Sequence, residues 1–379
     1  MTDLVQVGRR PAAPPEPEID TATTLAGIEF PNPVFTASGC SAAGRELSPF
    51  FEPADLGAIV TKSIMLAPRS GRPTPRMAET PSGMLNSIGL QGPGIDAFLE
   101  NDLPWLAERG ARAVVSIAGS TVEEYAKVAS KLRGHEGISF LEVNISCPNV
   151  EDRGQVFACD PVRAAEVVTA VRRNTSFPVF VKLSPDVTSI VEIAQACVEA
   201  GAHGLSMINT LLGMVLDPVT LRPALGGITG GLSGPAIRPV AIRCIWQVRQ
   251  ALPEIPILGM GGIRSGADAL QFLAAGANAV SVGTAVFGDP GAPVRVLREL
   301  RTELAARGMK AVSEAVGFAH RPPDLPAPTT TRRARRTAES ADDPAASDLD
   351  TATHDTGELA PLTDEVLAQL DAEGAGDDS

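Results

Sequence analysis

Short apolar runs rich in β-branched residues alternate with longer stretches rich in Ala, Glu and Arg from about residue 24 to residue 307. This alternation is typical of a parallel sheet whose strands are connected by helices. Clear helical stretches include 122–132, 161–173 and 189–200. Eight apolar runs favour an α/β fold of the TIM (βα)8-barrel type over an open sheet. The runs are 33–37, 58–62, 113–118, 140–145, 179–183, 204–208, 257–260 and 279–282.

Each predicted strand is followed by glycine or by a polar side chain. In a (βα)8 barrel these strand ends converge on one face, where active sites lie. An insertion at 65–101 is too long for a bare loop, and we expect it to cover that face. The groups at the strand ends are Ser38-Gly39, Lys62-Ser63, Gly119-Ser120, Ser146-Cys147, Lys182 with Ser184, Asn209-Thr210, Gly261-Gly262 and Gly283-Thr284.

The two ends of the chain differ from its centre in composition. Residues 1–22 contain four closely spaced prolines, which block both helices and strand ladders, and we expect a flexible arm there. Residues 23–320 form the predicted barrel. Residues 321–379 begin with prolines and arginines and end in a stretch with thirteen acidic and no basic residues, which predicts a disordered acidic tail.

Charge and cysteine content exclude several functions. The net charge of −13 resides in the tail, so the barrel is formally neutral. Its composition therefore gives no sign of a basic surface that would bind nucleic acid or an anionic membrane. No apolar run is long enough to span a membrane, and the N-terminus lacks a signal-peptide core. The five scattered cysteines form no C-x-x-C pair, which argues against disulfides, zinc and iron–sulfur clusters. We expect a cytoplasmic protein.

Glycine-rich segments follow the seventh and eighth predicted strands, at 259–262 and 283–284, and a further segment lies at 230–234. Such barrels commonly bind phosphate at this position through backbone N–H groups. Each segment alone is equally consistent with a turn that needs positive φ. Together they favour a phosphate site.

Lys62 and Lys182 end the second and fifth strands among apolar residues. A lysine in this position is costly unless a negative group faces it, and we expect an anionic substrate or a reduced flavin. The alternative is a lysine whose stem is buried and whose ammonium reaches solvent.

Cys147 follows the fourth strand between two asparagines, and Pro148 restricts the turn that carries it. A thiolate on this face could act as a base or as a nucleophile, whereas the other four cysteines are expected to be core residues. Amides offer both donors and acceptors, which suits a pyrimidine-like ring with imide groups. The clustered amides are Asn86, Asn144, Asn149 and Asn209, with Ser87 and Thr210 beside them.

Several motifs, in this order, resemble those of the class 1 dihydroorotate dehydrogenases. Residues 79–91 resemble the family's substrate loop, and 144–149 resemble its active-site motif. Residues 230–235, 259–263 and 282–284 are similar to its flavin phosphate segments. The resemblance covers about 24–307, which is essentially the whole predicted barrel.

The resemblance implies FMN as cofactor and the oxidation of (S)-dihydroorotate to orotate in pyrimidine (UMP) biosynthesis. It implies that Cys147 removes the C5 proton while hydride passes from C6 to flavin N5, with Lys62 beside the flavin and Lys182 stabilising its reduced form. The implied substrate residues are Lys62, Asn86, Ser87, Ile88, Gly89, Leu90, Asn144, Asn149, Asn209 and Thr210. The implied FMN residues are Ser38, Lys62, Ser63, Asn144, Lys182, Ile208, Gly234, Gly261, Gly262, Gly283 and Thr284.

Within the family, the sequence of the substrate loop resembles that of the class 1B branch, which passes electrons to NAD through a separate FAD and iron–sulfur subunit. The resemblance therefore implies such a partner, together with a homodimer. The chain itself carries neither a dinucleotide fingerprint nor cluster cysteines, so the acceptor stays open between a partner and a soluble oxidant such as fumarate. Class 2 relatives are membrane-associated and use a serine base, which Cys147 argues against.

Two residues depart from the family pattern: Ser116 and Gly92 stand where asparagines are expected. A shorter side chain at 116 weakens a flavin contact by about 1 kcal/mol. Two other functions remain open. One is a dihydropyrimidine dehydrogenase-like enzyme with a similar Cys-Pro motif, although Asn149 favours orotate. The other is a non-catalytic barrel that binds FMN or a pyrimidine.

Overall fold

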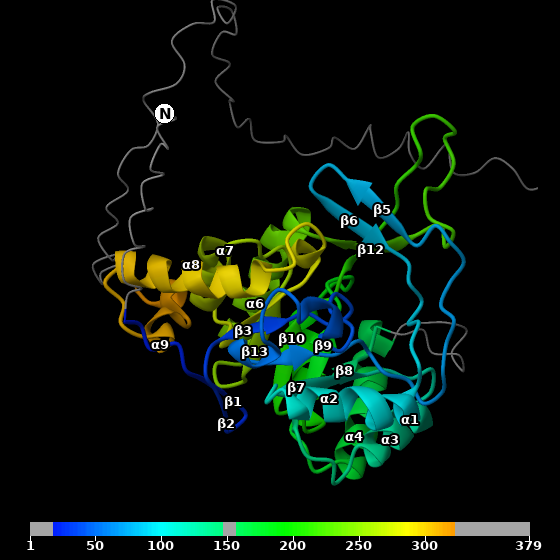
Figure 1. Ribbon diagram of the computed structural model, residues 1–379, viewed down its shortest axis with the longest axis horizontal. Helices are drawn as coiled ribbons and strands as arrows, with labels where there is room; N and C mark the ends of the chain where they lie inside the picture. Colours follow the sequence, from blue (N-terminus) through cyan, green and yellow to red (C-terminus); the bar gives the residue numbers. More distant parts are fainter. Residues whose placement is uncertain (1–17, 147–156, 323–379) are drawn as a thin grey trace, which may run out of the picture. The chain divides into compact units, whose positions relative to one another are not determined.

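The computed structural model describes residues 18–146 and 157–322. Its central strands are β3 (Val34–Thr36), β4 (Ile59–Val60), β7 (Ala113–Ile117), β8 (Ile138–Asn144), β9 (Val179–Leu183), β10 (Gly204–Met207), β13 (Ile257–Met260) and β14 (Ala279–Val282). They form one parallel sheet in the order β3-β14-β13-β10-β9-β8-β7-β4. Figure 1 shows β7, β8, β9 and β10 of this sheet together. Each predicted run coincides with one of these strands.

The two outer strands of this sheet meet and close it. The Gly57 N–H donates to Val34 O at 2.9 Å, and the Thr36 N–H donates to Ala58 O at 3.3 Å. Phe35 and Ala58 also form a parallel bridge. The predicted (βα)8 barrel is therefore confirmed, with its second strand shortened to two residues.

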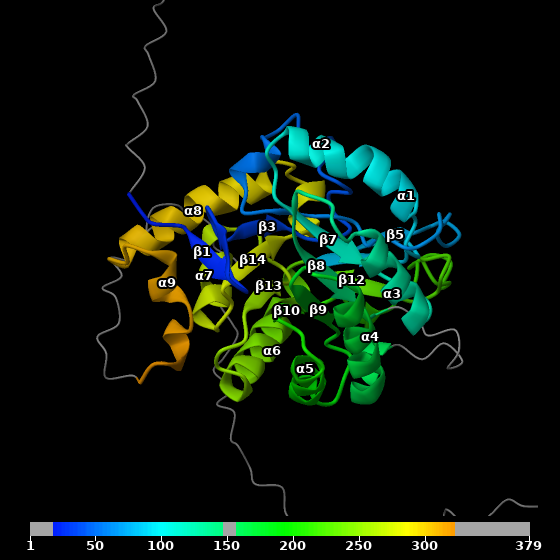
Figure 2. The ribbon, with the colours of Figure 1, turned by 90° about the horizontal axis from the view of Figure 1, so that it is seen from below.

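Helices surround the strands, as Figure 2 shows for α3 to α6. The side chains of Thr121, Ser189 and Ser265 each accept a hydrogen bond from an N–H three residues further on, so that α3, α5 and α7 begin there. The three predicted helices are confirmed as α3, α4 and α5. The helices are α1 (Ile95–Ala97), α2 (Leu103–Glu108), α3 (Val122–Lys131), α4 (Pro161–Asn174), α5 (Ile190–Glu199), α6 (Arg238–Ala251), α7 (Gly266–Ala274), α8 (Ala292–Ala306) and α9 (Val312–Ala315).

Aromatic rings fill the barrel interior near the starts of its strands. The Phe140 and Phe180 rings stack with centroids 4.2 Å apart, and Phe35 belongs to the same cluster. An N-terminal hairpin of β1 (Thr23–Leu25) and β2 (Ile28–Phe30) adds Leu25 and Phe30, both essentially fully buried. This apolar filling leaves polar groups to the opposite, carboxyl end of the strands.

A second sheet is built from two insertions into the barrel. Strands β5 (Met77–Thr80) and β6 (Gly83–Asn86) belong to the predicted insertion at 65–101. They pair with β11 (Leu211–Gly213) and β12 (Gly230–Ser233), which follow the sixth barrel strand. The antiparallel order is β11-β12-β6-β5, so the predicted substrate loop is fixed to a segment about 145 residues away in sequence. The expected cover over the strand ends is confirmed, although the contribution of β11 and β12 was not predicted.

The predicted terminal arm and acidic tail lie almost wholly outside the described residues, and their boundaries stay predictions. In the part of the chain that the structure describes, no helix is both long enough and apolar enough to cross a bilayer.

Candidate active site

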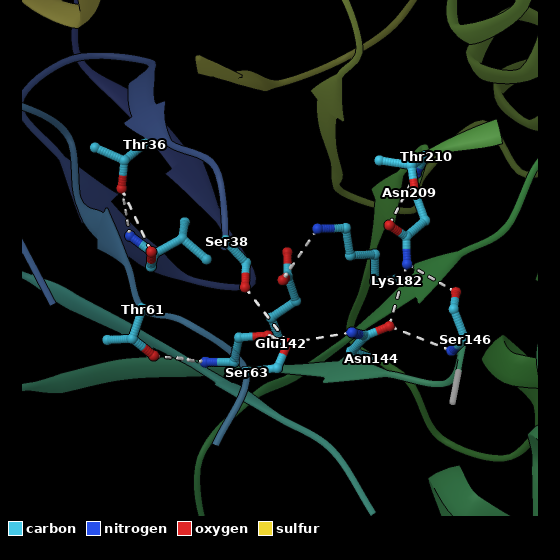
Figure 3. A network of polar contacts seen from close by, with 12 residues as sticks. Thr36, Ser38, Thr61, Ser63, Glu142, Asn144, Ser146, Lys182, Asn209 and Thr210 are labelled. Atoms are coloured by element: carbon cyan, nitrogen blue, oxygen red, sulfur yellow. Dashed lines mark hydrogen bonds and ion pairs between the residues drawn. The ribbon is translucent and has the colours of Figure 1, made fainter. Parts of the chain in front are cut away.

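A hydrogen-bonded network joins three strand ends (Figure 3). The Asn144 amide, at the end of β8, donates from Nδ2 to Ser63 Oγ at 3.1 Å. Its Oδ1 accepts from Asn209 Nδ2 at 3.2 Å and from the Ser146 N–H at 3.2 Å. Asn209 Nδ2 also donates to Ser146 Oγ at 2.8 Å, and its Oδ1 accepts from the Thr210 N–H at 2.8 Å. The structure therefore joins the predicted residues Ser63, Asn144, Asn209 and Thr210 in one network, in which Asn144 and Asn209 contact Ser146.

Ser63 extends this network toward the first and third strands. Its hydroxyl lies 3.4 Å from Ser38 Oγ and 2.9 Å from Ser116 Oγ. Ser116 is fully buried, so its hydroxyl is already bonded inside the protein. The short side chain at 116 thus has Ser63 as its partner, and the expected flavin contact stays a prediction.

A cavity of about 180 Å³ opens beside this network. It is larger than a single buried water requires. Ten of the residues implied by the resemblance line it: Ser38, Lys182, Ile208, Asn209, Thr210, Gly234, Gly261, Gly262, Gly283 and Thr284.

The glycines of this cavity have a geometry that other residues would not tolerate. Gly262 has φ +81°, and a Cβ added there would lie 2.6 Å from Gly234 O. Gly234 itself has φ +92° and directly precedes η5 (Pro235–Ile237) and α6. The bare backbone thus forms a close wall beside the start of a helix, as phosphate sites in such barrels do. Positive φ, the alternative explanation for these glycines, occurs at Gly234, Gly261 and Gly262 but not at Gly283, whose φ is −115°. The phosphate cradle stays a prediction.

A second cavity, of about 140 Å³, lies on the side of the insertion. Lys62, Ser63 and Leu90 line it together with Gly92. Gly92 forms an antiparallel bridge with Arg69, which fixes the end of the substrate loop. The insertion therefore reaches the strand end that carries Lys62.

Other residues of the predicted substrate loop are placed by the second sheet. Asn86 pairs with Gly231 in register, and its Nδ2 donates to Gly231 O at 3.2 Å. A Cβ added at Gly231 would lie 2.0 Å from Thr210 Oγ1, so Asn86 and Thr210 flank the same glycine.

The next residues of the loop contact an arginine that the sequence did not single out. Ser87 Oγ accepts from Arg72 Nη1 at 3.2 Å, and Ile88 O accepts from the Arg72 N–H at 3.0 Å. Gly89 packs against the Arg72 stem. Neither Ile88 nor Gly89 lines the two cavities described above.

Cys147 and Asn149 lie outside the described residues, so the placement of the expected base stays a prediction. Ser146, the residue before Cys147, is held by Asn144 and Asn209.

Lys182 is buried, with 6% of its surface exposed, and its Nζ lies 3.6 Å from Oε1 of the fully buried Glu142. The alternative of an ammonium that reaches solvent is therefore wrong for Lys182. Glu142 was missed, although a single carboxylate in the apolar run at 138–145 is a visible signal.

Cys40 also lines the larger cavity and was expected to be an ordinary core residue. Burial raises the pKa of its thiol, while Lys182 and Lys62 lower it to a smaller extent. The thiol is therefore mainly protonated near neutrality, unlike a reactive thiolate.

The fold and the site together define a (βα)8-barrel enzyme with a glycine-lined cavity, a buried lysine and an amide cluster at one end. No group of side chains within 18–146 and 157–322 could hold a metal ion. A family model described as dihydroorotate dehydrogenase matches residues 21–304. The chain belongs to the dihydroorotate dehydrogenase family of oxidoreductases.

Curated relatives agree with this family. The chain is 51% identical over 298 residues to a protein of Geobacter sp., covering 79% of this chain and 97% of the relative. It is 51% identical over 304 residues to one of Desulforudis audaxviator, covering 80% and 99%. It is 52% identical over 298 residues to one of Geotalea daltonii, covering 79% and 97%. All three are named dihydroorotate dehydrogenase B (NAD(+)), catalytic subunit, which confirms the resemblance to the class 1B branch.

Proposed function

We propose that this chain oxidises (S)-dihydroorotate to orotate in pyrimidine biosynthesis, with FMN as its cofactor. The observation that carries the proposal is the Asn144–Asn209–Ser63 network, because it adjoins the glycine-lined cavity on a barrel of this family. Its amides present donors and acceptors at the place where a cyclic imide substrate must be oriented.

The residues of the larger cavity fit a phosphorylated flavin. The close backbone wall at Gly234 and Gly262 would hold the phosphate, and Thr284 Oγ1, which donates to Ser233 Oγ at 2.8 Å, lies on the same wall. Lys182 would face the ring at the floor of the cavity. When bound, FMN supplies the hydride acceptor of the reaction, and the barrel supplies its orientation.

The chain's own residues would move the proton and hold the substrate. Cys147 would take the proton from C5 of dihydroorotate, as its position directly after Ser146 supports. Asn144, Asn209 and Asn149 would bind the ring, and Lys62 would neutralise the negative charge of its carboxylate. Hydride leaves C6 of the same substrate, so the C5–C6 bond becomes the double bond of orotate.

The names of the relatives specify a catalytic subunit and NAD. On that basis we extend the proposal to a separate FAD and iron–sulfur subunit that passes electrons to NAD. The family resemblance supports a homodimer of this chain, and its scattered cysteines support a cytoplasmic location.

Anaerobic addition of dihydroorotate to the purified protein tests this function. A bound flavin should lose its visible absorbance as it is reduced. Cys147→Ala should retain the flavin and slow this reduction by about 100-fold or more, because a general base typically contributes that much. Cys159→Ala is a matched control, since Cys159 is an exposed free thiol.

Three outcomes would contradict the proposal. A colourless protein that does not take up FMN would exclude FMN as the cofactor. Flavin that is reduced by dihydrouracil but not by dihydroorotate would indicate a dihydropyrimidine dehydrogenase-like enzyme instead. Unchanged reduction in Cys147→Ala would remove Cys147 from the role of base.

A further inference from the structure

An ion pair lies inside the barrel, between the aromatic filling and the larger cavity. Glu142 on β8 is fully buried, Lys182 on β9 is 6% exposed, and the two charged groups approach to 3.6 Å. Figure 3 shows their side chains extending toward each other from neighbouring strands. Lys182 also lines the larger cavity, whereas Glu142 does not.

Neither carboxylate oxygen of Glu142 accepts a hydrogen bond from the described residues. The groups beside the pair are small and polar: Ser116 faces Glu142 in strand register, and Ser206 faces Lys182. The Ser116 hydroxyl is bonded to Ser63, while the Ser206 hydroxyl has no partner among the described residues. Glu142 is therefore compensated mainly by one cation at a distance beyond direct hydrogen bonding.

Such a pair is hard to explain as a source of stability. Removing two charges from water costs more than a loose pair recovers, and a well-packed apolar pair of the same size is usually at least as stable. Eight strands already supply an apolar interior around this site. The pair is better explained by what it does to the group that occupies the cavity.

We propose that Glu142 is a positioning residue that holds the Lys182 ammonium at the cavity floor and offsets its charge. The floor then presents a balanced pair to the flavin instead of a bare cation. Among the described residues, the other ionisable groups near the pair are Lys62 and the Cys40 thiol, on which Lys182 and Lys62 both act, and Arg264 lines the same cavity. Glu142 is therefore the carboxylate that limits how strongly this cluster of cations favours a negatively charged ligand. This inference rests on the proposed function in one respect, that the ligand is a flavin.

The expected effect is on the redox equilibrium of the bound flavin. In Glu142→Gln the charge of Lys182 is unbalanced, so the negatively charged reduced flavin gains affinity over the oxidised form. We expect this affinity ratio to rise at least tenfold, which corresponds to about 30 mV for a two-electron couple. Lys182→Met should shift the ratio in the opposite direction, and Glu142→Gln/Lys182→Met should return it to within about threefold of the native value.

The experiment compares the native protein with these three variants by equilibrating bound FMN against a dye of known potential. Ser281→Ala is the matched control, because Ser281 is a buried residue of the same barrel whose hydroxyl has no partner in the described part, and it carries no charge. The reduction potential of FMN bound to Ser281→Ala should equal that of FMN bound to the native protein. Urea unfolding of the flavin-free proteins supplies a second readout: each single variant should be less stable than the double variant, because it buries one unpaired charge.

If Glu142→Gln does not fold, the comparison of Lys182→Met with the double variant still measures the effect of the Glu142 charge on the potential. The inference would be overturned if the affinity ratio of reduced to oxidised flavin changed less than threefold both from the native protein to Glu142→Gln and from Lys182→Met to the double variant. Glu142 would then be a structural residue. A native protein without flavin would overturn this inference together with the proposed function. A native flavin that dihydroorotate does not reduce, combined with the expected shift in Glu142→Gln, would overturn the proposed function alone.

Discussion

The Asn144 amide has a fixed orientation because both of its ends are used. Its Nδ2 donates to Ser63, and its Oδ1 accepts from Asn209 and from the Ser146 N–H. Rotating the amide by 180° would place donor against donor at the contacts with Asn209 and with the Ser146 N–H, whereas the Ser63 hydroxyl could donate instead of accept. The residue before the proposed base is thus tied to a rigid amide, which is the kind of support that keeps catalytic geometry.

His203 provides a second residue-scale contact, and it depends on pH. Its Nδ1 accepts from the Val179 N–H at 3.0 Å, which requires an unprotonated nitrogen. Burial, and to a smaller extent Arg172, lower the pKa of His203 from 6.5. Because the folded pKa is lowered, this contribution to stability is full above pH 6.5 and is lost as the pH falls through the folded value.

We therefore expect His203→Asn, which keeps an acceptor but does not titrate, to lose less stability than the native protein between pH 7.5 and pH 5. Urea unfolding at the two pH values measures the difference. His135→Asn is the control for the replacement of a histidine by asparagine, since His135 is exposed. Equal losses in the native protein and in His203→Asn would refute this assignment.

At the scale of elements, the backbone of the seventh strand's exit loop shapes the cavity. Gly262→Ala would force a non-glycine residue to φ +81° and press its Cβ against Gly234 O, so the loop must move. We expect FMN to bind about tenfold more weakly or worse, a loss of about 1.4 kcal/mol, as measured by flavin fluorescence titration. Gly308→Ala is a matched control, because Gly308 has φ +72° but no atom within 4 Å of the added Cβ. An equal loss of affinity in both variants would show that backbone strain, and not the cavity wall, is responsible.

The barrel elements were predictable from sequence because their strands are buried on both faces and read as continuous apolar runs. Strand β4 is an exception in length, since only Ile59 and Val60 keep regular pairing. The second sheet could not be predicted in the same way. Its strands β11 and β12 are short, partly exposed and rich in glycine, and their register depends on β6 from a distant insertion.

The residues of the site were likewise only partly predictable from the sequence. The convergence of Ser63, Asn144 and Asn209 follows from their positions at strand ends, so topology alone predicts it. The partner of Lys182 does not follow, because strand register and not sequence spacing brings Glu142 toward it. The sequence suggested that a negative ligand balances this lysine, whereas the structure shows a resident carboxylate.

On the scale of the whole molecule, the proposed function assigns one half of a redox reaction to this chain. The larger cavity and the amide network would serve the transfer from dihydroorotate to flavin. The sequence contains neither a G-x-G-x-x-G fingerprint nor a C-x-x-C pair, the usual marks of dinucleotide and cluster binding. These features agree with the proposal that electrons leave the flavin toward another molecule.

This arrangement predicts the behaviour of the isolated chain toward NAD. With FMN, dihydroorotate and NAD but no other protein, the chain should reduce its own flavin once and form no NADH above background, followed by absorbance at 340 nm. Addition of a separately purified FAD and iron–sulfur subunit should start continuous NADH formation, since that subunit would carry the electrons onward. NADH formation by the chain alone would contradict the need for a partner. Turnover with fumarate in place of NAD would identify a soluble acceptor, because reoxidation would then occur at the flavin of this barrel itself.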